Sequence, residues 1–167
     1  MSETFFDTAK RSSDEELRIL NRKIASNKLI FELLDGIPDY AVILNSNRHI
    51  VFSNSSARSI FVDEIPDRVI GHRLGEALNC VHAFDMPAGC GTSKFCEECG
   101  AAKAIKYTRE TGNSIINECR ISRRYNDIEL SLDLEVRSKI FYFQDERLIL
   151  FTFKDIANKK RREALER

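Results

Sequence analysis

The chain has 167 residues, a length that suits one globular domain with helical extensions and is too short for two full-sized domains. Lysine plus arginine and aspartate plus glutamate both number 26, so the net charge is zero and the electrostatic footprint of a nucleic-acid or polybasic membrane binder is absent. We therefore expect proteins or small ligands as partners, with no nucleic acid and no membrane.

The chain begins Met-Ser-Glu-Thr and has no apolar run of signal-peptide length. No stretch approaches the roughly 18 consecutive apolar residues of a membrane-spanning helix. These features predict a cytoplasmic location. Four of the five cysteines fall within residues 80–99, and in a cytoplasmic chain such clustering favours metal binding or redox chemistry over a disulfide framework.

An amphipathic helix is predicted after the capping residues Ser12 and Ser13, and it runs to about Leu34. Its apolar positions recur at alternating steps of three and four, with one polar residue among them: Leu17, Leu20, Ile24, Asn27, Phe31 and Leu34. This heptad pattern is typical of a helix that pairs with a copy of itself and so predicts a homodimer. A helix packed on its own domain explains the pattern equally well.

Short apolar runs predict five β-strands. The expected strands are residues 40–44, 49–52, 114–121, 128–136 and 148–153. In the fourth, Ile128, Leu130, Leu132, Leu134 and Val136 alternate with polar residues, which predicts one buried face and one wet face. Helices and loops are expected over residues 54–112, the last helix running from about Glu97 to Thr111 before Gly112.

This order predicts an α+β fold, a five-stranded antiparallel sheet with helices inserted between strands two and three. We expect residues 1–34 to form an N-terminal helical cap that could dimerise as a coiled coil. Residues 35–156 should form the domain, which carries the cysteine-rich segment 80–100. Residues 157–167 begin a charged C-terminal helix that ends while still helical, so we expect a further domain after it in the same polypeptide.

Four segments, taken in order, resemble the PAS fold of sensory domains. Residues 33–44 (LLDGIPDYAVIL) are similar to the entry into the first strand, and residues 49–57 (HIVFSNSSA) are similar to the second strand running into an Asn-containing helix start. Residues 70–78 (IGHRLGEAL) resemble the G-x-x-L-G-E segment, and residues 153–156 (FKDI) resemble the Asp-Ile-Thr exit, with Ala157 in place of Thr. The resemblance implies a role for Asp155 in signal relay, which that replacement leaves open.

The cysteine-rich segment is similar to that of a subset of PAS sensors. In that subset the resemblance implies an iron–sulfur cluster that responds to redox state or oxygen and regulates a histidine kinase of a two-component system or a similar output. We carry over only the four cysteines, Cys80, Cys90, Cys96 and Cys99.

Four thiolates suffice for one [2Fe–2S] cluster, one [4Fe–4S] cluster or one tetrahedral zinc ion. Structural zinc sites usually present two C-x-x-C pairs, whereas here nine residues separate the first two cysteines and only Cys96 and Cys99 form such a pair. The spacing therefore favours an iron–sulfur cluster, with zinc as the alternative. In the zinc alternative the domain is a metal-stabilised dimerisation module.

Several neighbours could support this centre. Gly91 lets the backbone turn and bring N–H groups toward the sulfurs, and Ser93 could add a hydroxyl donor. His82 could act as a ligand, but four cysteines already complete a site, so we expect it to donate a hydrogen bond near the centre. Cys119, on a predicted strand away from the cluster, is expected to be a buried structural thiol.

Catalysis has no support in the sequence, because no nucleophile–base motif, phosphate-binding loop or kinase signature is present. Two further hypotheses stay open. Cys96 and Cys99 could act as a redox dithiol, although the βαβ context of thioredoxin-like motifs is missing. A small organic ligand could occupy a cavity lined by aromatic residues such as Phe52 and Phe151.

Overall fold

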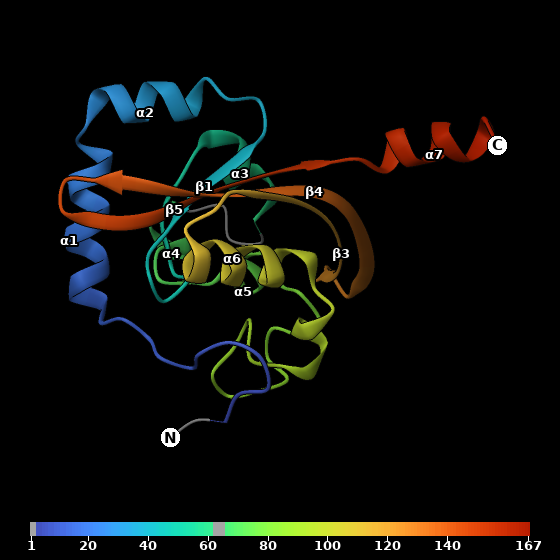
Figure 1. Cartoon of the computed structure of the whole chain (residues 1–167), viewed down its shortest axis with the longest axis horizontal. Helices are drawn as coiled ribbons and strands as arrows, with labels where there is room; N and C mark the ends of the chain where they lie inside the picture. Colours follow the sequence, from blue (N-terminus) through green and yellow to red (C-terminus); the bar gives the residue numbers. More distant parts are fainter. Residues whose placement is uncertain (1–2, 62–65) are drawn as a thin grey trace.

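The computed structural model describes residues 3–61 and 66–167, and its centre is a five-stranded sheet (Figure 1). The strands lie in the order β2-β1-β5-β4-β3 and every neighbouring pair is antiparallel. They are β1 (Tyr40–Leu44), β2 (Ile50–Ser53), β3 (Ile115–Tyr125), β4 (Ile128–Phe143) and β5 (Glu146–Asp155). The predicted α+β architecture and all five strands are confirmed.

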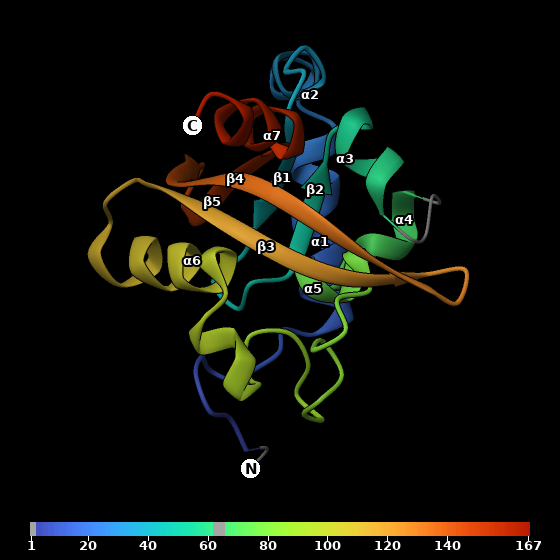
Figure 2. The same cartoon turned by 90° about the vertical axis from the view of Figure 1, so that its right-hand side faces the viewer.

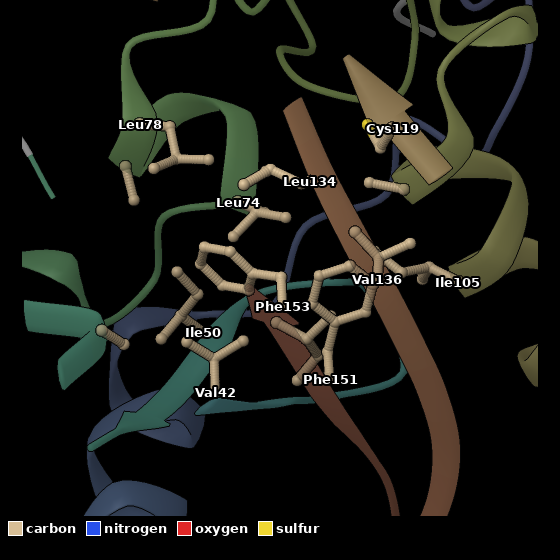
Figure 3. Close-up of a cluster of buried hydrophobic side chains, with 14 of the residues drawn as sticks. Val42, Ile50, Leu74, Leu78, Ile105, Cys119, Leu134, Val136, Phe151 and Phe153 are labelled. Atoms are coloured by element: carbon tan, nitrogen blue, oxygen red, sulfur yellow. The ribbon is translucent and has the colours of Figure 1, made fainter. Parts of the chain in front are cut away.

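The segment between β2 and β3 folds into short helices that cover one face of the sheet. These are α3 (Ser55–Ile60), α4 (Pro66–Val69), α5 (Leu74–Leu78), the 3₁₀ helix η1 (Lys94–Glu97) and α6 (Gly100–Thr111). Apolar side chains from α5 and α6, such as Leu74 and Ile105, pack against Val136, Phe151 and Phe153 of the sheet (Figure 3). This packing forms the main core, and the aromatic side chains of β5 fill its centre.

The N-terminal residues form two helices, α1 (Asp14–Ala25) and α2 (Lys28–Asp35), so the expected single helix to Leu34 is wrong. Asn27, which we placed as the polar member of a heptad seam, instead caps α2 by accepting a hydrogen bond from the N–H of Ile30. A capped helix start satisfies an otherwise free N–H group and ends the continuous pattern.

The apolar face of α1 is buried in its own domain. Leu17, Leu20 and Ile24 pack in a second core with Val51 and Phe52 of the sheet. Of the two explanations for the heptad pattern, the packing of α1 corresponds to the amphipathic helix on its own domain.

The hairpin of β3 and β4 projects beyond the rest of the sheet, and Figure 2 shows its tip standing clear of the helices. β5 pairs with β4 only from Leu134 onward. Ile128 is therefore 59% exposed and Leu130 is exposed as well, while Leu134 and Val136 are buried. The predicted buried face holds for the second half of the strand and is wrong for the first half.

The C-terminal helix α7 (Ala157–Leu165) extends away from the body of the domain (Figure 1). In the part of the chain that the structure describes, no helix combines the length and the apolar character needed to cross a membrane.

Candidate metal centre

The four clustered cysteines come from four different local structures and line one cavity of about 200 Å³. Cys80 follows the left-handed C-cap of α5, and Cys90 lies in the loop between Gly89 and Gly91, both with positive φ. Cys96 lies in η1, and Cys99 is the N-cap residue of α6. The cavity therefore brings together sulfurs that are spread over residues 80–99 of the chain.

Gly75 of α5 holds Cys80 and Cys90 side by side. Its N–H donates to the Sγ of Cys90 at 3.3 Å, and its carbonyl oxygen accepts from the N–H of Cys80 at 2.7 Å. A Cβ atom at position 75 would lie 2.7 Å from the Sγ of Cys90 and 3.4 Å from the Cβ of Cys80. Only glycine allows this approach without displacing Cys90.

The N-terminus of α6 positions Cys99. The Cys119 thiol, followed by the N–H groups of Ala102 and Ala101, interacts with its sulfur and lowers the pKa of Cys99 below its usual value. Burial instead raises the pKa of the Cys80, Cys90 and Cys96 thiols. In the metal-free protein these three are neutral thiols near pH 7, so binding a metal would release their protons.

Two buried arginines lie beneath the cysteine-bearing loop and line the same cavity. Arg73, 1% exposed, donates through Nη1 to the carbonyl oxygens of Ala88 at 2.9 Å and Cys90 at 3.3 Å. Arg48, 4% exposed, donates through Nη2 to the carbonyl oxygens of Cys90 at 3.1 Å and Thr8 at 2.9 Å. Burial, followed by the charge of Arg48, lowers the pKa of Arg73 to about 10, which still leaves it charged near pH 7.

Residues 4–12, the N-terminal strap, run alongside the cysteine-bearing loop (Figure 2). The N–H of Phe5 donates to the carbonyl oxygen of Thr92, and the N–H of Asp7 donates to that of Gly91, both at 2.9 Å. The strap then leads into α1. A displacement of the cysteine-bearing loop would therefore displace the strap and the start of α1.

Asp7 joins the strap to the arginines. Its carboxylate is 3% exposed and lies 3.3 Å from Nη1 of Arg48 and 2.5 Å from Nη2 of Arg109. Burial alone would raise the pKa of Asp7, but the hydrogen bond from Arg109 and the charge of Arg48 hold it below its usual value. The three side chains form a largely buried ion network, and Arg48 connects it to the cavity wall.

Comparison with solved structures gives the fold a name. The PAS domain of nitrogen regulation protein NR(II) from Vibrio parahaemolyticus superposes with a TM-score of 0.54 at 16% identity, over 78% of this chain and all of that one. The PAS domain of an HTR-like protein from Haloarcula marismortui gives 0.51 at 17% identity, over 83% of this chain and 98% of that one. The chain has the PAS fold.

A further structural match is the VqmA dimer of Vibrio cholerae, described in the absence of its target DNA. Its TM-score is 0.52 at 16% identity, and the match covers 80% of this chain and 54% of VqmA. No protein-family model matches the chain, and no curated protein matches it. At identities of 16–17% these matches support a shared fold and no shared function.

Within this PAS fold two of the expected supporting residues, His82 and Gly91, line the cavity with the cysteines. His82 lines the cavity, stacks on Phe95 at 3.9 Å between ring centroids, and pairs through Nδ1 with Asp85 at 2.9 Å. Gly91 also lines the cavity with φ of 92°. The hydroxyl of Ser93 caps η1 by accepting from the N–H of Phe95 and donates to Asp85, so it is already engaged away from the sulfurs.

Asp155 lies far from the cavity in the chain, at the end of β5. Its Oδ1 accepts from the N–H of Ala157 at 2.8 Å and so fixes the start of α7. The hydrogen bond connects the last residue of β5 to the first residue of α7.

Sequence reasoning missed several residues around this site. Arg48, Arg73 and Asp7 come from separate segments, and none of them interrupts an apolar pattern or stands beside a cysteine. His49 is also buried beside this site, with its Nε2 3.3 Å from Nη1 of Arg11. Buried charges held by distant partners leave no periodic signal in a sequence.

Cys119 is a buried thiol on β3, as predicted. It is far from the cysteine cluster in sequence, but its Sγ lies 3.8 Å from the Sγ of Cys99. The two meet because β3 returns across the N-terminus of α6.

The separation of the ligand atoms bears on the choice of metal. Within residues 3–61 and 66–167, no three His, Cys, Asp or Glu side chains converge closely enough to hold one metal ion. A tetrahedral zinc site with bonds of about 2.3 Å places its sulfurs roughly 3.8 Å apart. The four cysteines thus share a cavity without being drawn together around a single point.

Proposed function

We propose that this PAS domain is a sensory input domain that binds an iron–sulfur cluster through Cys80, Cys90, Cys96 and Cys99 and responds to redox state or oxygen. The observation that carries the proposal is the shared cavity, which has all four thiols on its wall. Four cysteines are the usual ligand set of [2Fe–2S] and [4Fe–4S] clusters.

The spacing of the cysteines along the chain supports a cluster over a single zinc ion. Structural zinc sites usually present two C-x-x-C pairs, and here only Cys96 and Cys99 form one. The cavity of about 200 Å³ lies below the roughly 300–1,000 Å³ of pockets for drug-sized ligands, which makes the small-ligand alternative weaker.

The charge of the cavity also supports a bound anion. Four thiolates give a cluster net negative charge, and a buried negative charge needs a nearby partner. Arg48 and Arg73 supply two buried cations on the cavity wall and also fix the carbonyl of Cys90. Peptide N–H groups, such as that of Gly75 on Cys90, are the kind of donor that tunes a cluster's potential.

The C-terminal helix is the proposed route of the signal. Lys160 of α7 lies 3.2 Å from Glu118 of β3 and 3.6 Å from Asp133 of β4, and Glu118 precedes Cys119. A change at the N-terminus of α6 would reach α7 through these contacts. The proposal includes an output domain in the same polypeptide, such as a histidine kinase, because a sensory domain needs one. It also includes a homodimeric assembly.

The test is metal and sulfide analysis of protein purified without oxygen. We expect iron and acid-labile sulfide in comparable amounts, and visible absorbance that air or oxidant bleaches. The four variants Cys80→Ser, Cys90→Ser, Cys96→Ser and Cys99→Ser should each lose the iron. Cys119→Ser is the matched control and should keep it. A colourless anaerobic preparation that contains zinc would overturn the proposal in favour of a redox-silent structural site.

A further inference from the structure

Cys119 is a fifth thiol that the proposed cluster does not use. Its Sγ lies 3.8 Å from the Sγ of Cys99, and within the described residues no other two thiols are joined by a hydrogen bond. Figure 3 shows Cys119 at the edge of the main core, with Leu134 and Ile105 also drawn. Cys119 is 3% exposed and is absent from the cavity wall, whereas Cys99 is partly exposed and lines the cavity.

The approach of the two sulfurs is built into the backbone. Gly100, the first residue of α6, lies so close to β3 that a Cβ there would be 2.0 Å from the carbonyl oxygen of Glu118 and 3.2 Å from the Cα of Cys119. The side chain of Asn117 donates to the carbonyl oxygen of Gly100 at 3.2 Å. The helix start that carries Cys99 is therefore held directly against the strand that carries Cys119.

We propose that Cys99 and Cys119 form a thiol–disulfide pair in the metal-free protein. Cys99, on the cavity wall, reacts first with a low-molecular-weight disulfide to give a mixed disulfide. Cys119, on the core side of Cys99, then displaces the small thiol and forms the Cys99–Cys119 bond. The pair goes beyond the proposed cluster and does not depend on it. Ligation of Cys99 by a metal would block the reaction, so the disulfide belongs to the protein that has lost or never acquired a metal.

The chemistry balances in two exchange steps. The thiolate of Cys99 attacks one sulfur of the external disulfide, whose S–S bond breaks and releases one thiolate. Cys119 then attacks the Sγ of Cys99, the mixed disulfide breaks, and the proton of Cys119 passes to the second departing thiolate. The two cysteines lose two electrons and two protons, and the external disulfide is reduced to two thiols.

Only a small movement is needed. A disulfide bond is about 2.05 Å long, so the two sulfurs must approach by roughly 1.8 Å. Rotation of the Cys99 side chain changes this distance and leaves the backbone of α6 in place, because Cys99 is the N-cap residue of that helix. The resulting bond would fasten the N-terminus of α6 to β3 beside Glu118, which pairs with α7.

The experiment uses the full chain, stripped of metal with a chelator, reduced, and freed of reductant. The protein is exposed to glutathione disulfide, quenched with N-ethylmaleimide, and analysed by intact mass and peptide mapping. We expect two of the five thiols to be lost, no glutathione to be retained, and a crosslink between the peptides that contain Cys99 and Cys119. A crosslink between Cys96 and Cys99, or five thiols that stay free, would overturn the proposal.

Two variants sharpen the result. Cys119→Ser should keep one glutathione on Cys99, because the resolving thiol is missing. Ser114→Ala, an exposed change just before β3, is the control and should form the Cys99–Cys119 crosslink as the unchanged protein does. If Cys119→Ser does not fold, the peptide map of the unchanged protein decides alone. Iron plays no part in this experiment, so its failure is distinguishable from failure of the cluster proposal.

Discussion

The carboxylate of Asp7 lies 3.3 Å from the guanidinium of Arg48, and both side chains are almost completely buried. Arg48 in turn donates to the carbonyl oxygen of Cys90 on the cavity wall. The pair thus links the N-terminal strap, the second strand's entry and the cysteine loop through a single buried contact. In the proposed sensor, a change at the cavity would therefore reach α1 as well as α7.

Replacing Asp7 tests that link. Asp7→Ala leaves Arg48 buried without its carboxylate, and breaking a buried ion pair costs about 3 kcal/mol of unfolding free energy. We expect that loss in urea denaturation, together with faster amide exchange in the strap. Glu3→Gln, which removes an exposed acid a few residues away, is the matched control. Equal stability of the two variants would contradict the role given to Asp7.

The buried His49 predicts a pH dependence of stability. Burial, followed by the charges of Arg73 and Arg11, lowers the pKa of His49 from 6.5 to about 4, while Glu76 opposes the shift. Because the unfolded chain binds the proton first, stability falls as the pH drops from about 6.5 toward about 4, by up to about 3 kcal/mol.

Urea titrations at several pH values measure this effect. His49→Gln should flatten the slope between pH 6.5 and 4, because the group that protonates only on unfolding is gone. His72→Gln is the control, since His72 is exposed, and it should keep the slope. An unchanged slope in His49→Gln would show that another group is responsible. Asp7 contributes only at lower pH, where its own carboxyl titrates.

The strands were predictable because their signal is local. The apolar run Tyr40–Leu44 is β1 to the residue, and the alternation after Ile128 located β4. The N-terminal helix was mispredicted because Asn27 suits two roles, a polar residue in a heptad seam and a helix N-cap. The sequence pattern fits both roles equally well. The packing of α1 against its own domain distinguishes them.

The candidate site was predictable only in its ligands. The spacing of Cys80, Cys90, Cys96 and Cys99 singled them out, and the structure brings them to one cavity. The arginines beneath the loop and the approach of Cys119 depend on contacts between segments far apart in the chain. Such contacts follow from the folded topology, which no residue pattern near the cysteines encodes.

Gly75 provides a test of the cavity's shape. In Gly75→Ala the added methyl would lie 2.7 Å from the Sγ of Cys90, so Cys90 must move. We expect iron retention to fall about tenfold or more, as for other substitutions that disturb the surroundings of metal ligands. The helix itself should not suffer, because alanine favours helix over glycine by about 1 kcal/mol.

Gly36→Ala is the matched control for that change. Gly36 ends α2, away from the cavity, and an added Cβ would meet only helix carbonyl oxygens at 3.3 Å and beyond. It should leave the iron content unchanged. Full iron in Gly75→Ala would mean that the tight packing around Cys90 has no part in holding a cluster.

The contact between Lys160 and Glu118 tests the route to the C-terminal helix. Exposed ion pairs contribute about 0–1 kcal/mol, so Lys160→Ala should barely change the unfolding free energy. It should instead remove the dependence of α7 amide exchange on the redox state of the protein, because the helix loses its attachment beside Cys119. Lys159→Ala, an exposed neighbour, should retain that dependence. If the amide exchange of α7 depends on redox state equally in both variants, Lys160 is not the coupling residue. The coupling would then run through the backbone hydrogen bond from Ile156 to Asp133 and the side chain of Asp155.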